Sequence, residues 1–138
     1  MNIRQATIED AAAIHALAMA AFGRDQVPLT LIEQQLNFGR VTYLVMEDFS
    51  AFLSYRQTLD EVDLSFVAVK PNAQGKGLGQ SLLQAMLAQL QDVTVYLEVA
   101  ENNQVARHLY EKAGFQIYAR REKYYHDGQT AIMMEKSL

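Results

Sequence analysis

The sequence predicts a single domain over residues 1–138, a mixed α/β (α+β) sheet with helices on both faces. The length of 138 residues fits one domain, and half of the residues are hydrophobic, which is enough for a core. Strand-like and helix-like segments follow one another in the order βααβββαβαββ. That order joins an antiparallel meander to one β–helix–β crossover, which we expect to be parallel and right-handed.

The N-terminal segment is predicted to form a short strand and two helices. The strand lies near Asn2 to Ala6, and Thr7 and Asp10 then fit a helix N-cap box. The first helix has apolar residues at helical spacing, namely Ile14, Leu17, Ala18 and Ala21. Gly23 breaks this helix, and Pro28 suits the first turn of a second helix that continues to about Leu36.

The middle of the chain is predicted to form strands joined by hairpins. The expected strands are Val41 to Met46, Ala51 to Gln57 and Val62 to Val69. They are rich in β-branched and aromatic residues, and the pairs Glu47-Asp48 and Leu59-Asp60 separate them. After a glycine-rich loop, a third helix is predicted from one apolar face, formed by Leu78, Leu82, Leu83, Met86, Leu87 and Leu90.

The C-terminal part is predicted to be a strand, a helix and two more strands. Val93 to Val99 alternates strictly, which places Glu98 on the face opposite the valines and Leu97. A helix runs from about Asn103 to Ala113, capped by Asn102 or Asn103, and Gly114 suits its left-handed C′ position. The final strands are Phe115 to Tyr125 and Thr130 to Met134.

The composition narrows the possible functions. A net charge of −4 argues against nucleic acid held on a basic face, and no apolar stretch is long enough for a membrane helix. The absence of cysteine excludes disulfides, a cysteine nucleophile and zinc-finger spacings. The three histidines lack metal-ligand spacing, so no metal is predicted. We expect a cytoplasmic protein, either a monomer or a homodimer.

The glycine-rich loop is the strongest indication of function. Gly75, Gly77 and Gly79 lie where a strand passes into a helix, and free N–H groups with partial positive charge suit a phosphate there. The spacing fits neither G-x-G-x-x-G nor a Walker P-loop, because the third glycine of the former would fall at Gln80 or Leu82. The loop is therefore interpreted as a pyrophosphate cradle, with a merely structural glycine-rich turn as the alternative.

Three segments resemble one protein family. Gln74 to Gly79, Q-G-K-G-L-G, resembles the Gln/Arg-x-x-Gly-x-Gly/Ala loop of the GCN5-related N-acetyltransferase (GNAT) superfamily, which holds the pyrophosphate of acetyl-CoA. Leu97 to Phe115 resembles the family's L-E-V-x-x-x-N-x-x-A-x-x-L-Y-E-x-x-G-F segment. Arg120 to Gly128 resembles the R-R-x-x-Y-Y-x-D-G run of the branch that acetylates protein N-termini, including a ribosomal protein's N-terminal alanine. The resemblance covers the whole chain and implies a GNAT-like sheet with splayed parallel strands at the cofactor site.

The resemblance also implies how acetyl-CoA is bound, as a co-substrate. The backbone of the strand before the loop and the side chain of Asn103, which can also cap its helix, are expected to contact the pantetheine arm. The residues implied for the whole coenzyme are Val67, Ala68, Val69, Gln74, Gly75, Lys76, Gly77, Leu78, Gly79, Gln80 and Asn103.

Acetyl transfer to an amine needs a base for the amine and a proton for the leaving thiolate. The resemblance assigns the base to Glu98 and the acid to Tyr110, with direct attack of the amine on the thioester. Asp63 is the rival base, because other members of the superfamily carry their base on that strand. An ion-paired surface carboxylate and a core tyrosine are the plainer alternatives for Glu98 and Tyr110.

The acceptor is predicted to be a primary amine, either a peptide N-terminus or a small amine. An α-amine is favoured because its pKa of about 8 makes the neutral nucleophile easier to reach than for lysine. Glu61 and Asp63 are expected to line the amine site, and Tyr124 and Tyr125 to hold a peptide backbone. The branch pattern is weaker here, since Phe66 replaces an amide and residues 22–25 lack a tryptophan. The alternatives are a GNAT enzyme for a small amine, amino acid or antibiotic, and a non-catalytic acyl-CoA-binding module.

Overall fold

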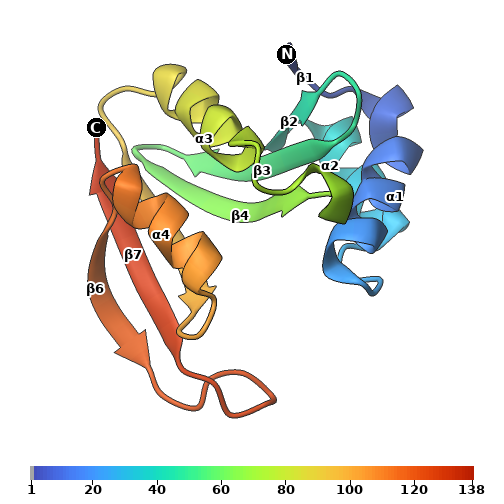
Figure 1. The fold of residues 1–138 in the computed structure, drawn as a ribbon. Coiled ribbons are helices and arrows are strands. Elements are labelled where there is room, and N and C mark those ends of the chain that lie inside the picture. The colour runs from blue at the N-terminus through green and yellow to red at the C-terminus, as the bar shows by residue number, and fades with distance from the viewer. Residues whose placement is uncertain (1) are drawn as a thin grey trace.

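The computed structural model describes residues 2–138 and shows one seven-stranded sheet with helices packed against it (Figure 1). The strands are β1 (Ile3–Gln5), β2 (Val41–Met46), β3 (Ala51–Thr58), β4 (Glu61–Val69), β5 (Thr94–Ala100), β6 (Gln116–Arg121) and β7 (Ala131–Ser137). The α-helices are α1 (Ala11–Phe22), α2 (Leu29–Phe38), α3 (Leu78–Ala88) and α4 (Gln104–Lys112), and the short 3₁₀ helices are η1 (Ile8–Asp10) and η2 (Pro71–Ala73). The predicted order of elements is confirmed.

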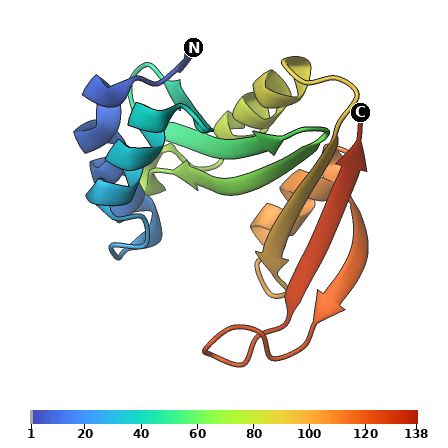
Figure 2. The same cartoon turned by 180° about the vertical axis from the view of Figure 1, so that it is seen from behind.

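The sheet divides at its one parallel pair of strands. Its strand order is β1-β2-β3-β4-β5-β7-β6, and every pair except β4–β5 is antiparallel. β4 and β5 pair only from Glu61 opposite Thr94 to Asp63 opposite Tyr96, after which they separate. In Figures 1 and 2 the β5–β7–β6 part consequently diverges from the β1–β4 part. The splayed parallel strands predicted for the cofactor site are confirmed.

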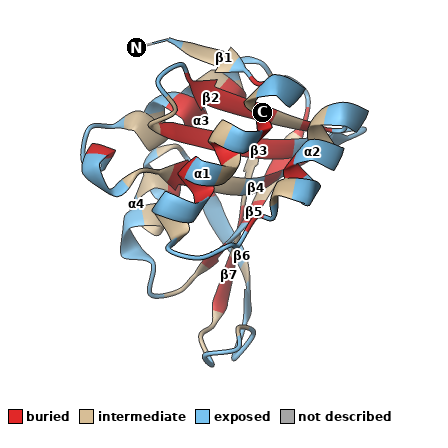
Figure 3. Cartoon of the chain, turned by 90° about the vertical axis from the view of Figure 1, so that its right-hand side faces the viewer, coloured by how far each residue is buried: buried red, intermediate tan, exposed pale blue. Residues whose placement is uncertain are grey.

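Helices cover the two parts of the sheet differently. One apolar cluster joins β2–β5 and β7 to α3 and the end of α4, and contains the fully buried Leu82, Leu83 and Met86. A second cluster joins β2–β4 to α1 and α2 and is centred on Tyr43 and Phe52. No described residue of β5, β6 or β7 belongs to this second cluster. Strands β2 and β3 are therefore covered on both faces, as their red colour in Figure 3 shows, whereas the β5–β7–β6 part is covered on one.

Several predicted boundaries were wrong, and each for a local or tertiary reason. The second helix continues past Leu36 to Phe38, because Gly39, with a φ of 67°, is the residue that ends it. The third helix ends at Ala88, and Leu90 lies in the turn that follows, where its N–H donates to the carbonyl of Leu87. Pro28 is the N-cap of the second helix and lies just before its first turn.

The last hairpin also differs from the prediction. The strand expected to continue to Tyr125 ends at Arg121, because Lys123 has a φ of 53° and turns the chain out of the sheet. The final strand begins at Ala131 and reaches Ser137, three residues beyond the predicted end, because it pairs with β5 along its whole length. Residues 122–130 therefore form a loop at the end of the β5–β7–β6 part of the sheet.

Candidate active site

A cleft of about 540 Å³ lies beside the point where β4 and β5 separate. We call it the donor cleft. Among its lining residues are nearly all of those predicted to bind the coenzyme, namely Val67, Ala68, Val69, Gln74, Gly75, Gly77, Leu78, Gly79, Gln80 and Asn103. Lys76 is the exception: it is exposed and lies outside the lining. The segments brought together are the second half of β4, the start of α3 and the face of α4.

The start of the donor cleft is made of backbone groups. Gly75 and Gly77 have φ values of 80° and 77°, a left-handed conformation that few other residues adopt readily. Gly77 caps α3, and its carbonyl accepts hydrogen bonds from the Ser81 N–H at 3.0 Å and the Ser81 hydroxyl at 3.1 Å. Within the described chain, no protein acceptor faces the backbone N–H groups of residues 75–80. These free donors, at the positive end of a helix dipole, suit a pyrophosphate.

Gly79 lies between α4 and β4 at this cleft, where a Cβ atom would make ordinary van der Waals contacts. A Cβ atom at this position would lie 3.4 Å from Leu109 Cδ2 on α4 and 3.8 Å from Val67 Cγ1 on β4. Farther along, β4 pairs with β3 on one edge and leaves its other edge free after Asp63. Main-chain groups on a free edge need partners. An extended, amide-bearing chain such as pantetheine fits this edge.

α4 contributes two of the predicted residues. Asn103 caps the helix, since its Oδ1 accepts a hydrogen bond from the Ala106 N–H at 3.2 Å, and it also lines the donor cleft. Tyr110 is buried, with 8% of its surface exposed, and its ring packs edge-on against Phe115 at 5.9 Å. Burial raises the pKa of Tyr110 to about 12. The phenol at the donor cleft therefore keeps its proton throughout the neutral range.

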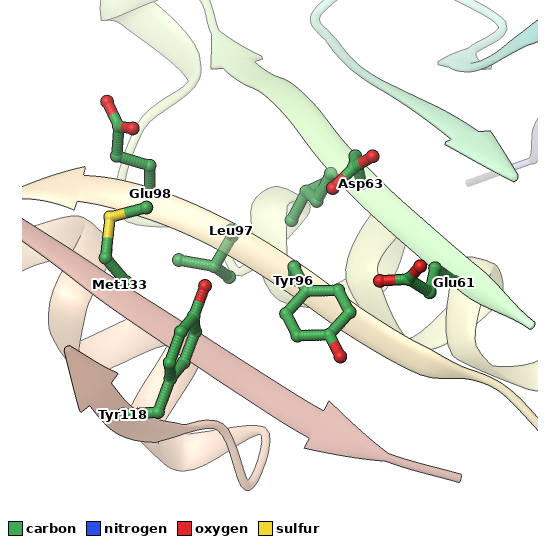
Figure 4. Close-up of a pocket in the computed structure, with 8 residues that line it drawn as sticks. Glu61, Asp63, Tyr96, Leu97, Glu98, Tyr118 and Met133 are labelled. Atoms are coloured by element: carbon green, nitrogen blue, oxygen red, sulfur yellow. The ribbon is translucent and has the colours of Figure 1, made fainter. Parts of the chain in front are cut away.

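A second pocket, of about 440 Å³, lies on the face of the splayed strands that no helix covers (Figure 4). We call it the acceptor pocket. Its lining residues are Glu61, Asp63, Leu64, Tyr96, Leu97, Glu98, Tyr118 and Met133. Three of them are carboxylates, and none is lysine, arginine or histidine. Glu61, Asp63 and Glu98, all predicted from the sequence, are thus brought together at one pocket.

Glu98 lies on the exposed face of β5 because side chains alternate between the two faces of the strand. Val95, Leu97 and Val99 are buried, while Glu98 is exposed on the opposite face, as the sequence predicted. Its carboxylate has no ion pair among the described residues. The Tyr125 hydroxyl donates a hydrogen bond of 3.0 Å to Glu98 Oε1.

Tyr124 and Tyr125 lie outside the lining of the acceptor pocket, in the loop of residues 122–130. Their rings meet edge-on at 5.2 Å, and the guanidinium of Arg121 lies 4.4 Å from the centre of the Tyr124 ring. Burial, followed by the hydrogen bond to Glu98, raises the pKa of Tyr125 above that of free tyrosine. Their expected contact with a peptide backbone stays a prediction.

Three aromatic residues that line these sites were not identified from the sequence. Tyr96 and Tyr118 line the acceptor pocket, with rings edge-on at 5.9 Å. Phe22 lines the donor cleft from the end of α1, and its ring lies 6.0 Å from that of Phe66. The alternation along β5 that predicts Glu98 on the face opposite the valines also predicts Tyr96, two residues earlier, on the same face as Glu98. Tyr118 had no such signal, because β6 has a register shift between Ile117 and Ala119.

The two sites share their strands. β4 lines the acceptor pocket with Glu61, Asp63 and Leu64 and the donor cleft with Val67 to Val69, while β5 leads directly into α4. A carboxylate on β5 and a phenol on α4 therefore lie on the two sides of the opening between the strands. This arrangement can bind an anionic, extended donor on one side and a cationic acceptor on the other.

Comparison with known proteins agrees with this architecture. Residues 10–115 match the acetyltransferase (GNAT) family, so the chain belongs to that family. The ribosomal protein bS18-alanine N-acetyltransferase of Haemophilus ducreyi is 34% identical over 100 residues, which are 70% of this chain and 69% of the relative. The protein of the same name from Salmonella typhimurium is 39% identical over 91 residues, 62% of each chain.

A solved structure supports the same assignment. The crystal structure of the ribosomal-protein-S18-alanine N-acetyltransferase from Escherichia coli superposes with a TM-score of 0.82 at 28% identity, over 99% of this chain and 94% of that one. The sequence alignments with the two curated relatives span 62% to 69% of those proteins. The family and the fold predicted from the sequence are confirmed, and the relatives are N-acetyltransferases, as predicted.

The described residues contain neither a membrane-spanning helix nor a metal-binding cluster. None of the helices in residues 2–138 is both long and apolar enough to cross a membrane. No group of three or more His, Cys, Asp or Glu side chains in this part of the chain is arranged to hold a metal ion.

Proposed function

We propose that this protein transfers the acetyl group of acetyl-CoA to the α-amine of a protein or peptide N-terminus. The observation that carries the proposal is the pair of sites on the two sides of the separated strands. The donor cleft has free backbone N–H donors and Tyr110, and the acceptor pocket has Glu98 among three carboxylates.

The donor cleft would hold the coenzyme through groups that the chain already leaves free. The N–H groups of residues 75–80 would bind the pyrophosphate. The edge of β4 at residues 67–69, which β5 leaves unpaired, would pair with the pantetheine amides, displacing the Gln74 side-chain amide that donates to the Val69 carbonyl at 3.4 Å. Asn103 would add a side-chain contact to the same arm. When bound, the thioester supplies an activated acetyl group.

The chain then provides the proton transfers. Glu98, directly or through one water, removes a proton from the ammonium of the acceptor, with Asp63 as the alternative base in the same pocket. The amine nitrogen forms a bond to the acetyl carbon and loses its second proton to solvent as the carbon–sulfur bond breaks, and Glu98 then releases its own proton to solvent. Tyr110 donates its proton to the thiolate and recovers one from solvent. Because the pKa of Tyr110 is raised to about 12 by burial, the phenol is in its donor form before each turnover.

The acceptor pocket suits a cation that must become neutral. Three carboxylates without a basic neighbour attract an ammonium group. At neutral pH, the neutral form costs roughly 1 kcal/mol for an α-amine and about 4–5 kcal/mol for a lysine side chain. A single exposed carboxylate is therefore better matched to an α-amine. The relatives from Haemophilus ducreyi and Salmonella typhimurium carry the name of an N-acetyltransferase for an N-terminal alanine.

The test compares classes of acceptor under identical conditions. Peptides with a free N-terminus, the same peptides with a blocked N-terminus and one lysine, and a set of amino acids and polyamines are incubated with acetyl-CoA. Thiol release and mass spectrometry report the rate and the modified atom. We expect the free-N-terminus peptides to react fastest. Faster reaction of the lysine peptides would exclude the α-amine, and faster reaction of the small amines would identify a small-molecule acetyltransferase.

A further inference from the structure

Glu98 has a single hydrogen-bond partner among the described residues, the hydroxyl of Tyr125. The O–H donates to Glu98 Oε1 at 3.0 Å, from a residue 27 positions away in the chain. The two arginines at the end of β6 are engaged elsewhere, since Arg120 forms an ion pair with Glu101 and Arg121 lies over the ring of Tyr124. The carboxylate is therefore oriented by a neutral phenol.

The loop of residues 122–130 holds Tyr125 in place from both sides. Its N–H donates to the carbonyl of Gln129 at 3.2 Å, and its carbonyl accepts from the Gly128 N–H at 2.9 Å. The loop is tightened further by Asp127, whose carboxylate accepts from the Gln129 N–H at 3.0 Å and from its side-chain amide at 2.8 Å. The Tyr125 ring also rests against Tyr124. An exposed loop thus presents the phenol at a fixed position.

Glu98 needs such a support because the strand alone does not orient it. Its side chain is exposed and has three rotatable bonds, so without a partner its carboxylate would sample several positions over the acceptor pocket. A base acts efficiently only within hydrogen-bond reach of the proton it removes. Holding one oxygen by Tyr125 leaves the other oxygen of the carboxylate available for the amine or for a water.

We infer that Tyr125 is a positioning residue, which holds the Glu98 carboxylate over the acceptor pocket. The inference rests on the proposed function, because it assumes that Glu98 is the base. It also differs from the role expected from the sequence. A phenol has one hydrogen, so while Tyr125 donates to Glu98 it cannot donate to a peptide carbonyl.

The test is a double-mutant cycle with an adjacent control. Tyr125→Phe should lower kcat about three- to tenfold, the size expected for the loss of one hydrogen bond, with the KM of the peptide unchanged. In a Glu98→Gln background, where there is no base to position, the same substitution should change kcat by less than about twofold. Tyr124→Phe is the matched control, because its hydroxyl makes no hydrogen bond in the described structure, so any effect of this substitution on kcat should be the same in both backgrounds.

Three results would overturn the inference. A rise in KM with kcat unchanged, or an equal effect of Tyr125→Phe in both backgrounds, would make Tyr125 a substrate contact. A Tyr125→Phe variant with the turnover of the wild-type protein would show that the hydrogen bond has no role.

A second measurement does not depend on activity. With ¹³Cζ-labelled tyrosine, the signal missing from the Tyr125→Phe spectrum is that of Tyr125, and we expect it to shift in Glu98→Gln. An unchanged signal would show that the contact does not form in solution. If the wild-type protein acetylated no peptide, the proposed function would fail, whereas this spectrum would still decide whether Tyr125 and Glu98 are in contact.

Discussion

The donor cleft and the acceptor pocket are built from different chemical groups of the same chain. The beginning of the donor cleft is main chain: two left-handed glycines, the free N–H groups of residues 75–80 and the unpaired edge of β4. The acceptor pocket is formed by side chains from β4, β5, β6 and β7. A site of backbone groups is set by one short segment, whereas a site of side chains depends on how several strands are aligned.

The two sites also differ in electrostatics. The donor cleft begins at the positive end of α3, which suits an anion. The acceptor pocket contains three carboxylates, which suit a cation. Substitutions in one site should therefore change one substrate's binding or reaction and leave the other's intact, and the following experiments test this separation.

The largest effect is expected at the acceptor pocket. Glu98→Gln should lower kcat by about 10²–10⁴-fold, the contribution typical of a general base, and leave the affinity for CoA nearly unchanged. Asp63→Asn is the matched control, because Asp63 lines the same pocket and the substitution removes the same charge. Rapid thiol-release kinetics and calorimetry measure the two quantities. A far greater loss in Asp63→Asn would move the base to β4.

The next effect is expected at the donor cleft, from Tyr110→Phe. Removing the hydroxyl should lower kcat about 10²-fold and preserve packing, since the ring would still meet Phe115. Because burial raises the pKa of Tyr110 to about 12, its loss of a proton cannot cause a fall in wild-type activity between pH 8 and pH 10. The pH–rate profile of both proteins checks this. An alkaline fall in that range that disappears in Tyr110→Phe would contradict the buried, protonated phenol.

The comparison explains how far the sequence could predict these sites. The donor residues lie within one segment plus one helix, and glycine spacing reports backbone conformation directly. Gly75, Gly77 and Asn103 accordingly line the same cleft, and their contact with the coenzyme stays a prediction. The first and last residues of β2 were also predicted correctly, since a buried strand between short turns has few other positions at which it could begin or end. Lys76 was included only because it lies between two glycines, and its side chain is exposed outside the cleft.

The acceptor residues were harder to predict because they depend on long-range pairing. Tyr118 reaches the pocket only because β6 pairs with β7 through a register shift, and nothing local in the sequence indicates that shift. The strand continued in the prediction to Tyr125 because residues 115–125 are rich in strand-forming side chains. The left-handed Lys123 ends it instead, and so places Tyr125 beside Glu98.

A binding experiment tests whether the backbone conformation of the glycine-rich loop is needed to bind the coenzyme at the donor cleft. A coenzyme at about one hundred times its dissociation constant should stabilise the wild-type protein by about 2.7 kcal/mol, a shift of several degrees in Tm. Gly77→Val should remove this shift, because a β-branched residue does not tolerate the φ of 77° that shapes the cradle. Gly39→Val is the matched control: its φ is 67°, and it ends α2 outside the cleft. Equal shifts in both variants would exclude the loop as the coenzyme site.

The smallest effect is expected from a substitution outside both sites, and it provides a reference for the effects of the other variants. Asp10 accepts two hydrogen bonds from the Arg4 guanidinium, at 2.8 and 2.9 Å, and one from the Thr7 N–H at 2.8 Å. The hydrogen bonds from Arg4 hold the pKa of Asp10 below its ordinary value. Since the folded-state pKa is depressed, this stabilisation is present above pH 4 and is lost as the pH falls through the folded-state value. Asp10→Asn should therefore cost about 1 kcal/mol at pH 7, the size expected for a partly exposed ion pair with good geometry, and progressively less below pH 4. Urea unfolding from pH 7 to pH 3 measures the difference in the free energy of unfolding between the two proteins.

At a temperature where both proteins are folded, kcat and the shift in Tm with CoA should be the same for both. A difference that grew as the pH fell would show that Asp10 does not stabilise the protein as a charged cap. A loss of activity at pH 7 would show that the N-terminal region contributes to one of the sites.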